Sequence, residues 1–573
     1  MPVLAFRGKE WGINIMENLI FILCFVVFFI LIIIKEALQA RKREKAFIKS
    51  LYENYGSIPK KEYSLERYQR IASYYNRHKR EGQLDDITWN DLNMDEIFKR
   101  MNYTFSASGE EYLYYTLRNT GNSKEELEHL EEIVNYFREH ADERVKVQFL
   151  MSQLGYTGKF SLYDYIDQLD YLGKRTNSKH YLFNFLFIPF LLLMPYQLSI
   201  SLAGLAVLIV YNILSYFKEK RDIEPYVISF SYIMRLLQVC DKLCMTEIEA
   251  CEKEWEEIRK HKSVLKVMRK GSFWVLSGNN SITTGNPLDI VIDYVKMIFH
   301  VDLIHFNKML QGVRAHVEDI DRLISTVGYL EAAIAVGAFR ESLEEFCVPE
   351  LIENDSFCMI DGYHPLLLNP VKNSIQTQKG VLLTGSNASG KSTFLKTVAI
   401  NAILAQTIHT CAASGYTAQL YDIYSSMSLR DSIESGESYY IVEVKALKRI
   451  VDAASQTKRP ILCFVDEVLR GTNTIERIAA STQILQSLTG NKYLCFAATH
   501  DIELTELLKA SFDNYHFEED IRDGDIFFNY QLMKGKATTR NAIKLLEIMG
   551  YQKCIIDKAS RQAEHFVCTG SWE

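Results

Sequence analysis

The chain has 573 residues, 48% of them apolar, and a formal net charge of −7 at pH 7. Its length suits about three to four domains of roughly 150 residues, and its apolar content excludes a disordered protein. The mild acidity excludes a global positive field, so any contact with DNA would come from a local patch. The eleven cysteines form no C-x-x-C pair and accompany no histidine cluster at zinc-ligand spacing, so we expect reduced thiols and no structural metal.

The first apolar run, LIFILCFVVFFILIII at residues 19–34, predicts a membrane anchor. It nearly reaches the roughly 17 to 25 residues of a spanning helix. A cleaved signal peptide is the alternative, but its apolar core would be about 7 to 15 residues long and would precede small residues. Here Lys35 and the basic segment 41–45 follow, whereas only Arg7 and Lys9 precede. This charge bias places the chain after the run in the cytoplasm.

The second apolar stretch, residues 181–217, contains no charged residue. One helix of this length would exceed the roughly 30 Å hydrocarbon core, and Pro195-Tyr196-Gln197 offers a break, so we expect a transmembrane hairpin. The downstream leg, Leu198–Phe217, has full spanning length. The upstream leg, Tyr181–Met194, is short and contains Pro189, which suits a tilted, re-entrant or interfacial segment. A buried helix pair in a soluble domain is the alternative, although this stretch lacks a polar face.

The segments around this stretch have the periodicity of long packed helices. Residues 123–155 and 289–339 repeat apolar side chains at three- and four-residue spacing. Ser123 and Glu126 have the spacing of a capping box. Residues 251–270 end in a cluster of basic side chains, which is compatible with binding phosphates or anionic headgroups and equally with a solvated helix end.

From about residue 350, strand-like runs alternate with helices, and the first of them leads into a phosphate-binding motif. The strand 381–384 precedes a G-x-x-x-x-G-K-[ST] sequence. Backbone N–H groups of such a loop surround phosphates, Lys391 can reach the β- and γ-phosphates, and the Ser392 hydroxyl can bind Mg²⁺. The residues expected to bind ATP here are Gly385, Ser386, Asn387, Ala388, Ser389, Gly390, Lys391, Ser392 and Thr393.

Two further strands end in polar residues suited to ATP hydrolysis. The apolar strand 461–465 is followed by Asp466 and Glu467. The first carboxylate can hold Mg²⁺ and the second can orient the attacking water. The strand 493–498 leads to His500, which can contact the γ-phosphate or the water when strand ends of a parallel sheet meet.

Five segments, in this order, resemble the MutS family of mismatch-repair ATPases and their paralogues, which belong to the ABC ATPase superfamily. These segments are Tyr363–Leu366, Gly385–Thr393, Ser435–Glu443, Asp466–Glu476 and Ala498–Leu504. Residues 88–119 look like the start of the family's helical core, so the resemblance covers roughly residue 87 to the C-terminus, interrupted by the apolar stretch.

The resemblance implies a homodimer with composite ATP sites. The family pattern G-x-S-T-F-x-x-E lies at residues 436–443, in a loop that reaches the partner's nucleotide in family members, and it implies that Ser438 lies near the γ-phosphate in trans. Tyr439 stands where threonine is usual, and Leu469 where glycine is common. Asn373 matches the family position near the adenine.

We therefore expect a mixed fold in which an all-α core and lever region is interrupted by a transmembrane hairpin and followed by an α/β P-loop ATPase domain of ABC type. The expected units are an N-terminal membrane anchor (1–45), a helical core (46–180), the hairpin (181–217), a helical lever and core (218–350) and the ATPase domain (351–573). We expect neither the family's mismatch-recognition domain before the helical core nor an added nuclease domain after the ATPase.

The expected function is that of a membrane-anchored, multi-pass MutS-like ATPase whose ATPase domain is cytoplasmic and dimerises on ATP. Catalysis would use Lys391, Glu467, His500 and the partner's Ser438, with Mg²⁺ at Ser392 and Asp466. DNA binding or DNA maintenance follows from the resemblance and not from composition. An ABC-type transporter, which would normally carry an L-S-G-G-Q stretch, and a scaffolding or mechanical ATPase acting on a membrane partner are the alternatives.

Overall fold

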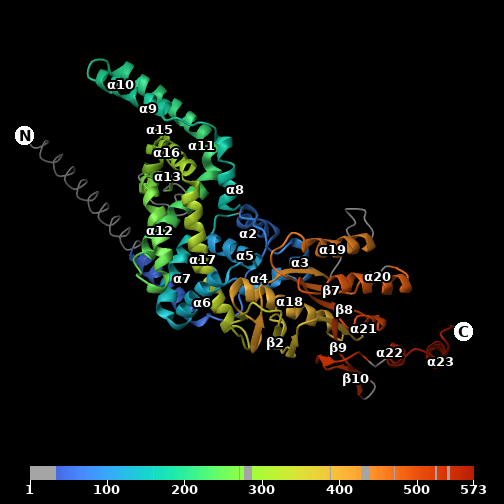
Figure 1. Cartoon of the computed structure of the whole chain (residues 1–573). Helices are drawn as coiled ribbons and strands as arrows, with labels where there is room; N and C mark the ends of the chain where they lie inside the picture. The colour runs from blue at the N-terminus through green and yellow to red at the C-terminus, as the bar shows by residue number, and fades with distance from the viewer. Residues whose placement is uncertain are drawn as a thin grey trace, which may run out of the picture.

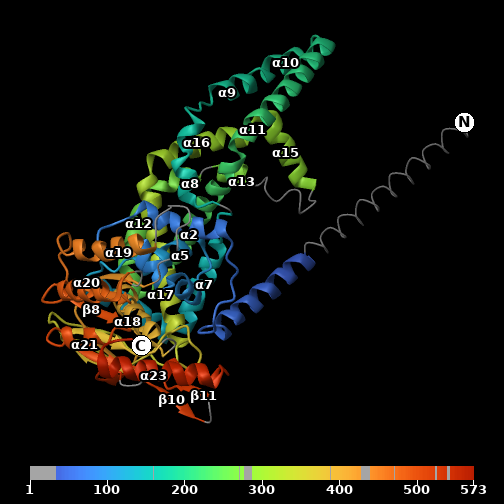
Figure 2. The same ribbon diagram turned by 90° about the vertical axis from the view of Figure 1, so that its right-hand side faces the viewer.

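The computed structural model describes residues 34–158, 160–269, 271–276, 287–386, 389–427, 439–469, 472–522, 525–537 and 542–572. A helical part and a C-terminal α/β part lie side by side, and an arm of helices extends from the helical part away from the sheet (Figure 1). Figure 2 shows the same arm from another side. This agrees with the expected mixed fold, in which a helical region precedes a C-terminal α/β region. Most of the predicted N-terminal anchor lies outside the described residues.

The helical part begins with a helix over residues 34–53. Its further helices are α2 (Leu65–Arg77), α3 (Asp86–Asp91), α4 (Met94–Met101), α5 (Ala107–Arg118), α6 (Lys124–Glu139), α7 (Ala141–Leu154), α8 (Leu162–Asp167), α9 (Ser178–Phe185), α10 (Phe187–Leu193), α11 (Leu198–Leu243), α12 (Glu252–Leu265), α13 (Ser272–Leu276), α15 (Pro287–Phe299), α16 (Val301–Ala315) and α17 (Val317–Glu341). The capping box at the start of α6 is confirmed, because Ser123 and Glu126 each accept the other's backbone N–H.

Helices α5 and α17 pack closely at the centre of this part because two glycines remove side chains from their contact. A Cβ at Gly109 would lie 2.0 Å from Glu331 Oε2, and a Cβ at Gly328 would lie 2.6 Å from Tyr112 Cβ. The buried Glu331 carboxylate accepts hydrogen bonds from the Ser106 hydroxyl and from backbone N–H groups that precede α5. It thereby satisfies donors at a helix N-terminus that lack intrahelical partners.

The apolar stretch forms two helical legs separated at residues 194–197, as expected. We call residues 178–217 the arm. Its upstream leg is divided at Leu186 into α9 and α10. Its downstream leg is only the first part of α11, a helix of 46 residues that ends at Leu243 and contains Pro225. The helix itself thus extends beyond Phe217, where the predicted spanning leg ends. Beyond Phe217 the helix passes through largely exposed charged residues and then packs apolar side chains such as Ile223, Phe230 and Leu237 into the helical part.

Two described helices are long and apolar enough to cross a membrane, α11 and α17, but their environments differ. In the most apolar 18-residue window of α11 only 17% of the residues are buried, whereas 78% are buried in that of α17. Helix α17 is therefore a core helix. The arm presents its apolar side chains outward, and its base is held by ion pairs from Lys179 to Glu219 and from Arg175 to Asp222.

The basic cluster predicted at residues 251–270 is largely paired with acidic side chains. Asp241 binds both Lys262 and Arg269, and Arg259 contacts Glu252. These pairs favour the interpretation as a solvated helix end over a phosphate-binding patch.

The α/β part contains a six-stranded sheet of order β12-β9-β4-β8-β7-β6, a four-stranded sheet of order β1-β5-β2-β3 and the pair β10-β11. Its elements are β1 (Glu350–Leu351), β2 (Phe357–Gly362), β3 (Asn373–Thr377), β4 (Gly380–Thr384), α18 (Lys391–Ile408), β5 (Gly415–Ala418), β6 (Asp422–Ser426), α19 (Tyr439–Ala453), β7 (Ile461–Asp466), α20 (Thr474–Ser487), β8 (Tyr493–Ala498), α21 (Glu503–Leu507), β9 (Phe512–His516), β10 (Glu519–Arg522), β11 (Asp525–Phe528), β12 (Met533–Lys534), α22 (Ala542–Ile548) and α23 (Lys553–Thr569). The three predicted strands are confirmed as β4, β7 and β8.

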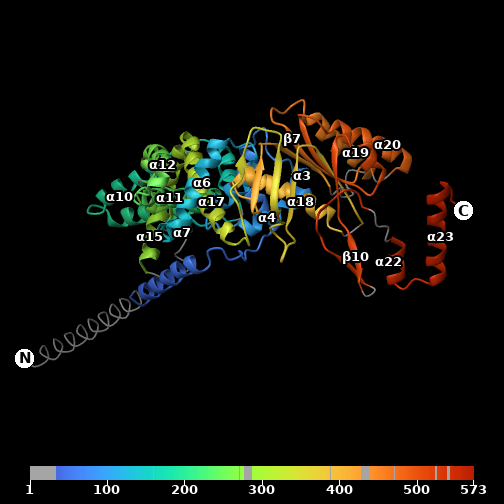
Figure 3. The ribbon, with the colours of Figure 1, turned by 60° about the horizontal axis from the view of Figure 1, so that its bottom comes forward.

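The central strands of the large sheet are parallel and buried on both faces. Alternate side chains point to opposite faces: Leu383, Phe464 and Phe496 join the core that contains α18, whereas Leu382, Cys463 and Cys495 join the core that contains α19 to α21. Figure 3 shows α19 and α20 together, with α22 and α23 beyond β10 near the C-terminus. The register pairs Ala498 with Leu383 on one side and with Asp466 on the other, so the carboxyl ends of three strands meet.

Candidate nucleotide-binding site

The phosphate loop connects the end of β4 to the start of α18. Gly385 and Gly390 have φ values of +138° and +109°, which only glycine adopts readily. A Cβ at Gly385 would also lie 2.8 Å from Phe517 O. The Gly390 carbonyl accepts the Phe394 N–H, so the helix begins directly after the loop. Of the predicted loop residues, Asn387 and Ala388 lie outside the described residues.

Lys391 is the first residue of α18, and its ammonium group turns back over the loop. Its Nζ donates to Gly385 O at 2.9 Å and to Ser386 O at 2.8 Å. The next two side chains, Ser392 and Thr393, are exposed and line a cavity. The structure thus places a cation and two hydroxyl groups at one helix N-terminus, where the helix dipole favours an anion.

The predicted carboxylates lie at the end of β7, with Asp466 as its last residue and Glu467 directly after it. Glu467 has a φ of +59°, and its backbone N–H donates to Ala498 O at 2.9 Å, which ties it to the end of β8. Its Oε1 lies 2.9 Å from His500 Nε2. The Asp466 Oδ1 atom is buried and has no hydrogen-bond partner among the described residues. A buried carboxylate oxygen in this position suits a bound cation, because leaving it unpaired is costly.

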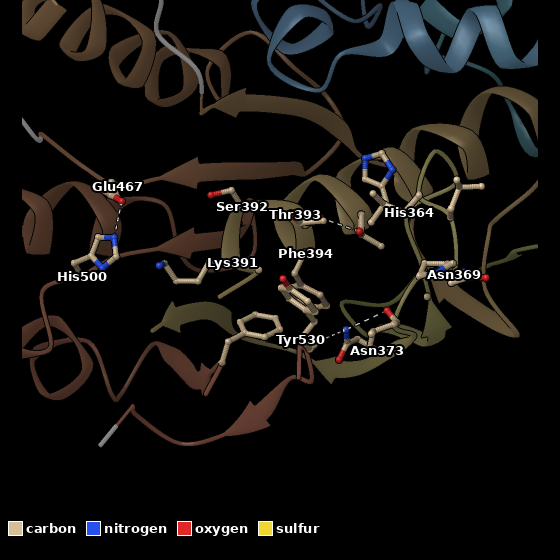
Figure 4. A pocket seen from close by; sticks show the side chains of 18 residues that line it. His364, Asn369, Asn373, Lys391, Ser392, Thr393, Phe394, Glu467, His500 and Tyr530 are labelled. Atoms are coloured by element: carbon tan, nitrogen blue, oxygen red, sulfur yellow. Dashed lines mark hydrogen bonds and ion pairs between the residues drawn. The ribbon is translucent and has the colours of Figure 1, made fainter. Parts of the chain in front are cut away.

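A cavity of about 670 Å³ joins these groups to a more distant set of side chains. Lys391, Ser392, Glu467 and His500 line one end, His364 and Asn373 line the other, and Phe394 and Tyr530 lie between them (Figure 4). The cavity has the volume typical of a small-molecule site. Its two ends differ in chemistry, since charged groups gather at one and aromatic and amide groups at the other.

His364 is neutral at this second end. Burial and the nearby Lys396 lower the His364 pKa to about 4, and its Nδ1 accepts the Leu366 N–H at 3.3 Å. Asn373 does not present a free amide, because it donates to Tyr530 O at 3.0 Å and accepts the Leu532 N–H at 2.7 Å. Asn373 therefore holds the Tyr530 segment over the cavity, a role that its sequence position did not reveal.

The sequence interpretation missed Glu519 and Tyr530. The Ser386 hydroxyl of the phosphate loop donates to the Glu519 carboxylate, and the Tyr530 ring lies 3.1 Å from where a Cβ at Gly390 would be. Both residues come from the chain after β9, far from the loop in sequence. No local motif marks them, so only the folded chain could identify them.

The predicted trans-acting Ser438 lies outside the described residues, but the helix that follows it is visible. Glu443 of α19 is buried, and its Oε1 accepts the Leu469 N–H at 2.5 Å. Leu469 has a φ of +58°, the left-handed region that favours glycine. This conformation gives a physical reason why glycine would suit the position. The hydrogen bond between Glu443 and Leu469 also connects α19 to the turn that carries Glu467.

The α/β part resembles known proteins over much of its length. Residues 381–567 match the MutS domain V family. The chain is 29% identical over 267 residues to DNA mismatch repair protein MutS of a Roseiflexus species, a match that covers 44% of this chain and 24% of that protein. It is 28% identical over 281 residues to human MutS protein homolog 4, covering 46% of this chain and 29% of that protein.

A MutS protein of Thermus thermophilus is 31% identical over 203 residues, which cover 35% of this chain and 25% of that protein. The chain thus spans between about a quarter and a third of the length of these curated relatives.

Proposed function

We propose that this chain, whose residues 381–567 match MutS domain V, is a MutS-type ATPase that binds and hydrolyses ATP with Mg²⁺. One observation carries the proposal: the phosphate loop, Glu467 and His500 lie at the carboxyl ends of neighbouring parallel strands and line one cavity. Ligands bind at such strand ends in open α/β sheets. The names of the relatives, DNA mismatch repair proteins among them, support ATP-dependent DNA maintenance as the process.

The residues present fit a magnesium nucleotide. Asp466 offers a buried oxygen without a described partner, and Ser392 offers an exposed hydroxyl. Mg²⁺ commonly takes only one or two protein ligands and completes its shell with phosphate oxygens and water. When bound, the ion would neutralise charge on the phosphates. The nucleoside would occupy the end of the cavity near His364 and Tyr530.

Each polar side chain then has a task in hydrolysis. Lys391 would leave the loop carbonyls and bind the β- and γ-phosphate oxygens. Glu467 would orient the attacking water and accept its proton, and the 2.9 Å contact between Glu467 and His500 would fix both side chains beside the γ-phosphate. The loop that contains Ser438 would complete the site of a second copy, so that ATP binding favours a homodimer. This last step rests on the MutS resemblance.

We also propose that the arm inserts in the membrane, with the ATPase domain in the cytoplasm. The support is the outward apolar surface of the arm and the charged pairs at its base. Without water in the hydrocarbon core, helices are the form in which such a segment satisfies its backbone. Membrane attachment through the helical region favours a role other than that of a standard mismatch sensor.

An ATPase assay on the detergent-solubilised full chain tests the proposal. We expect Mg²⁺-dependent turnover that the Lys391→Ala variant loses, and stimulation by duplex, branched or mismatched DNA. The absence of turnover in the wild-type chain would overturn the ATPase function. Turnover that none of the DNA forms stimulates would overturn the DNA role and favour a mechanical ATPase that acts on a membrane partner. Stimulation of turnover by a translocated solute would favour a transporter.

A further inference from the structure

A second cavity, of about 560 Å³, lies inside the helical part and is separate from the nucleotide site. It is bounded by α2, α5, α6, α12 and α17, which lie together beside the sheet (Figure 1). Thr407, near the C-terminal end of α18, also lines it. A molecule in this cavity would therefore contact the helix whose first residue is Lys391.

One wall of this cavity is a row of neighbouring tyrosine rings. Tyr112 lies 5.6 Å from Tyr115 and 6.1 Å from Tyr329, and Tyr74 lies 5.4 Å from Tyr112, all measured between ring centroids. These phenols are uncharged near neutral pH, and burial raises the pKa of each of them further. Faces of such rings attract cations.

Glu254 of α12 supplies a charged group to the same cavity. The residue is only 5% exposed, and its Oε1 lies 2.8 Å from Nε2 of His129, whose ring stacks on Tyr329. Its Oε2 is also buried but has no hydrogen-bond partner among the residues that the structure describes. Leaving a buried carboxylate oxygen without a hydrogen bond costs more free energy than leaving a neutral polar group unpaired. We therefore expect a ligand in this cavity to supply a hydrogen-bond donor.

The rim carries both signs. Exposed basic side chains (Arg80, Lys253 and Arg322) and exposed acidic ones (Glu125, Glu126 and Glu318) line it. These charges lie toward solvent and do not by themselves select a ligand. The selective group is the buried Glu254 oxygen beside the aromatic wall.

We propose that this cavity binds an organic ammonium compound that donates an N–H to Glu254 Oε2 and packs its carbon chain or ring against Tyr112 and Tyr329. A charge-assisted hydrogen bond would satisfy the carboxylate, and the tyrosine faces would stabilise the cation. A quaternary ammonium has the same charge but no N–H. It would contact the tyrosine faces but could not donate a hydrogen bond to Glu254. The proposal concerns a site apart from the ATPase centre and does not depend on hydrolysis.

Isothermal titration calorimetry on the solubilised full chain without nucleotide tests this site. The probes are 2-phenylethylamine and spermidine, with choline as the cation that lacks an N–H. We expect both amines to bind saturably and choline to bind about tenfold more weakly or worse, since the hydrogen bond to a charged acceptor is lost. No saturable binding of either amine would overturn the proposal, and so would equal binding of choline.

The Glu254→Gln variant adds a second comparison at nearly constant volume. It should weaken both amines by about tenfold or more, because the amide loses the charge of the acceptor. The matched control is Glu318→Gln, which removes an exposed rim carboxylate and should change binding by less than about twofold. Unchanged binding in Glu254→Gln would overturn the assignment of the carboxylate. The comparison of amines with choline needs no variant, so it stands even if Glu254→Gln folds poorly.

Discussion

At the residue scale, the side chains that sequence alone could predict are those that follow a recognisable strand. Asp466 ends β7 and Glu467 follows it, while Lys391 and His500 lie in the segments that follow β4 and β8. The parallel register brings these strand ends together. Glu519 and Tyr530 lie over the phosphate loop without any local signal. Their positions depend on the path of the chain after β9, which spacing does not reveal.

Glu467 should control turnover and not nucleotide binding. In Glu467→Gln we expect kcat to fall by about 100-fold or more, because a general base typically contributes 10² to 10⁴ to the rate. ATP should bind with similar affinity and remain trapped, as measured by single-turnover assay and nucleotide retention. The control is Glu503→Gln, at the start of α21. Wild-type turnover in Glu467→Gln would contradict the assigned role.

Glu519 should oppose ATP binding. Its carboxylate accepts the Ser386 hydroxyl within the phosphate loop, so incoming phosphates meet a like charge. We expect Glu519→Gln to lower the KM for ATP by about threefold to tenfold, which corresponds to roughly 1 kcal/mol. Steady-state kinetics measure this. Glu518→Gln is the matched control, because that neighbouring carboxylate contacts His516 at 3.0 Å. A raised KM in Glu519→Gln would show that the carboxylate assists binding instead.

At the element scale, buried polar contacts connect the helical part to the sheet. Arg340 near the end of α17 binds Glu131 of α6 at 2.6 Å and donates to His409 O at 2.9 Å, just after α18. At the edge strand β6, Asp91 at the end of α3 accepts the Ser425 hydroxyl at 2.7 Å and the Met427 N–H at 2.9 Å. These contacts hold α6 and α17 against the end of α18, and α3 against the edge strand β6. Periodicity predicted the helices but could not predict which of them would meet the sheet.

The Glu131 carboxylate should make the free energy of unfolding depend on pH in the acidic range. Hydrogen bonds and charge from Arg340 and His409 outweigh burial and lower the Glu131 pKa to about 2. The folded state therefore holds this proton less tightly than the unfolded state, whose carboxylate titrates near pH 4.3. Its contribution is present above that pH and is lost as pH falls toward 2.

Denaturant unfolding of Glu131→Gln measures this contribution. We expect a loss of about 3 kcal/mol at pH 7, because Arg340 stays buried without its ionic partner. The difference in the free energy of unfolding between Glu131→Gln and the wild-type chain should shrink as pH falls below about 4. Glu132→Gln removes an exposed neighbouring carboxylate and should cost less than about 1 kcal/mol. A constant difference across this range of pH would contradict the assignment.

At the scale of the whole molecule, the arm extends from the helical part, whereas the nucleotide site lies at the carboxyl ends of the strands of the large sheet. The helical segment before the arm and the ATPase after it belong to one packed body, so the two ends of the arm should lie on the same side of a membrane. That requires an even number of crossings. The turn at residues 194–197 would then reach the opposite side.

Cysteine labelling tests this topology. Tyr196 in the turn is 85% exposed, and Leu65 in the helical part is 77% exposed. In intact cells a membrane-impermeant maleimide should label Tyr196→Cys strongly and leave Leu65→Cys at background until the membrane is opened. Labelling of neither cysteine before permeabilisation would show that the short upstream leg is re-entrant. Equal labelling of both after lysis without membranes confirms that each is reactive.

The sequence by itself determined the local features: helices from their apolar period, β4, β7 and β8 from apolar runs, and the phosphate loop from glycines whose backbone angles other residues resist. Only the tertiary structure decided which of two apolar helices is core, because α17 is buried by neighbours and the start of α11 is not. It alone joined Glu519 and Tyr530 to the phosphate loop and Glu254 to an aromatic cavity. Local propensity acts between neighbours in sequence, whereas burial and hydrogen-bond satisfaction depend on residues that folding brings together from distant positions.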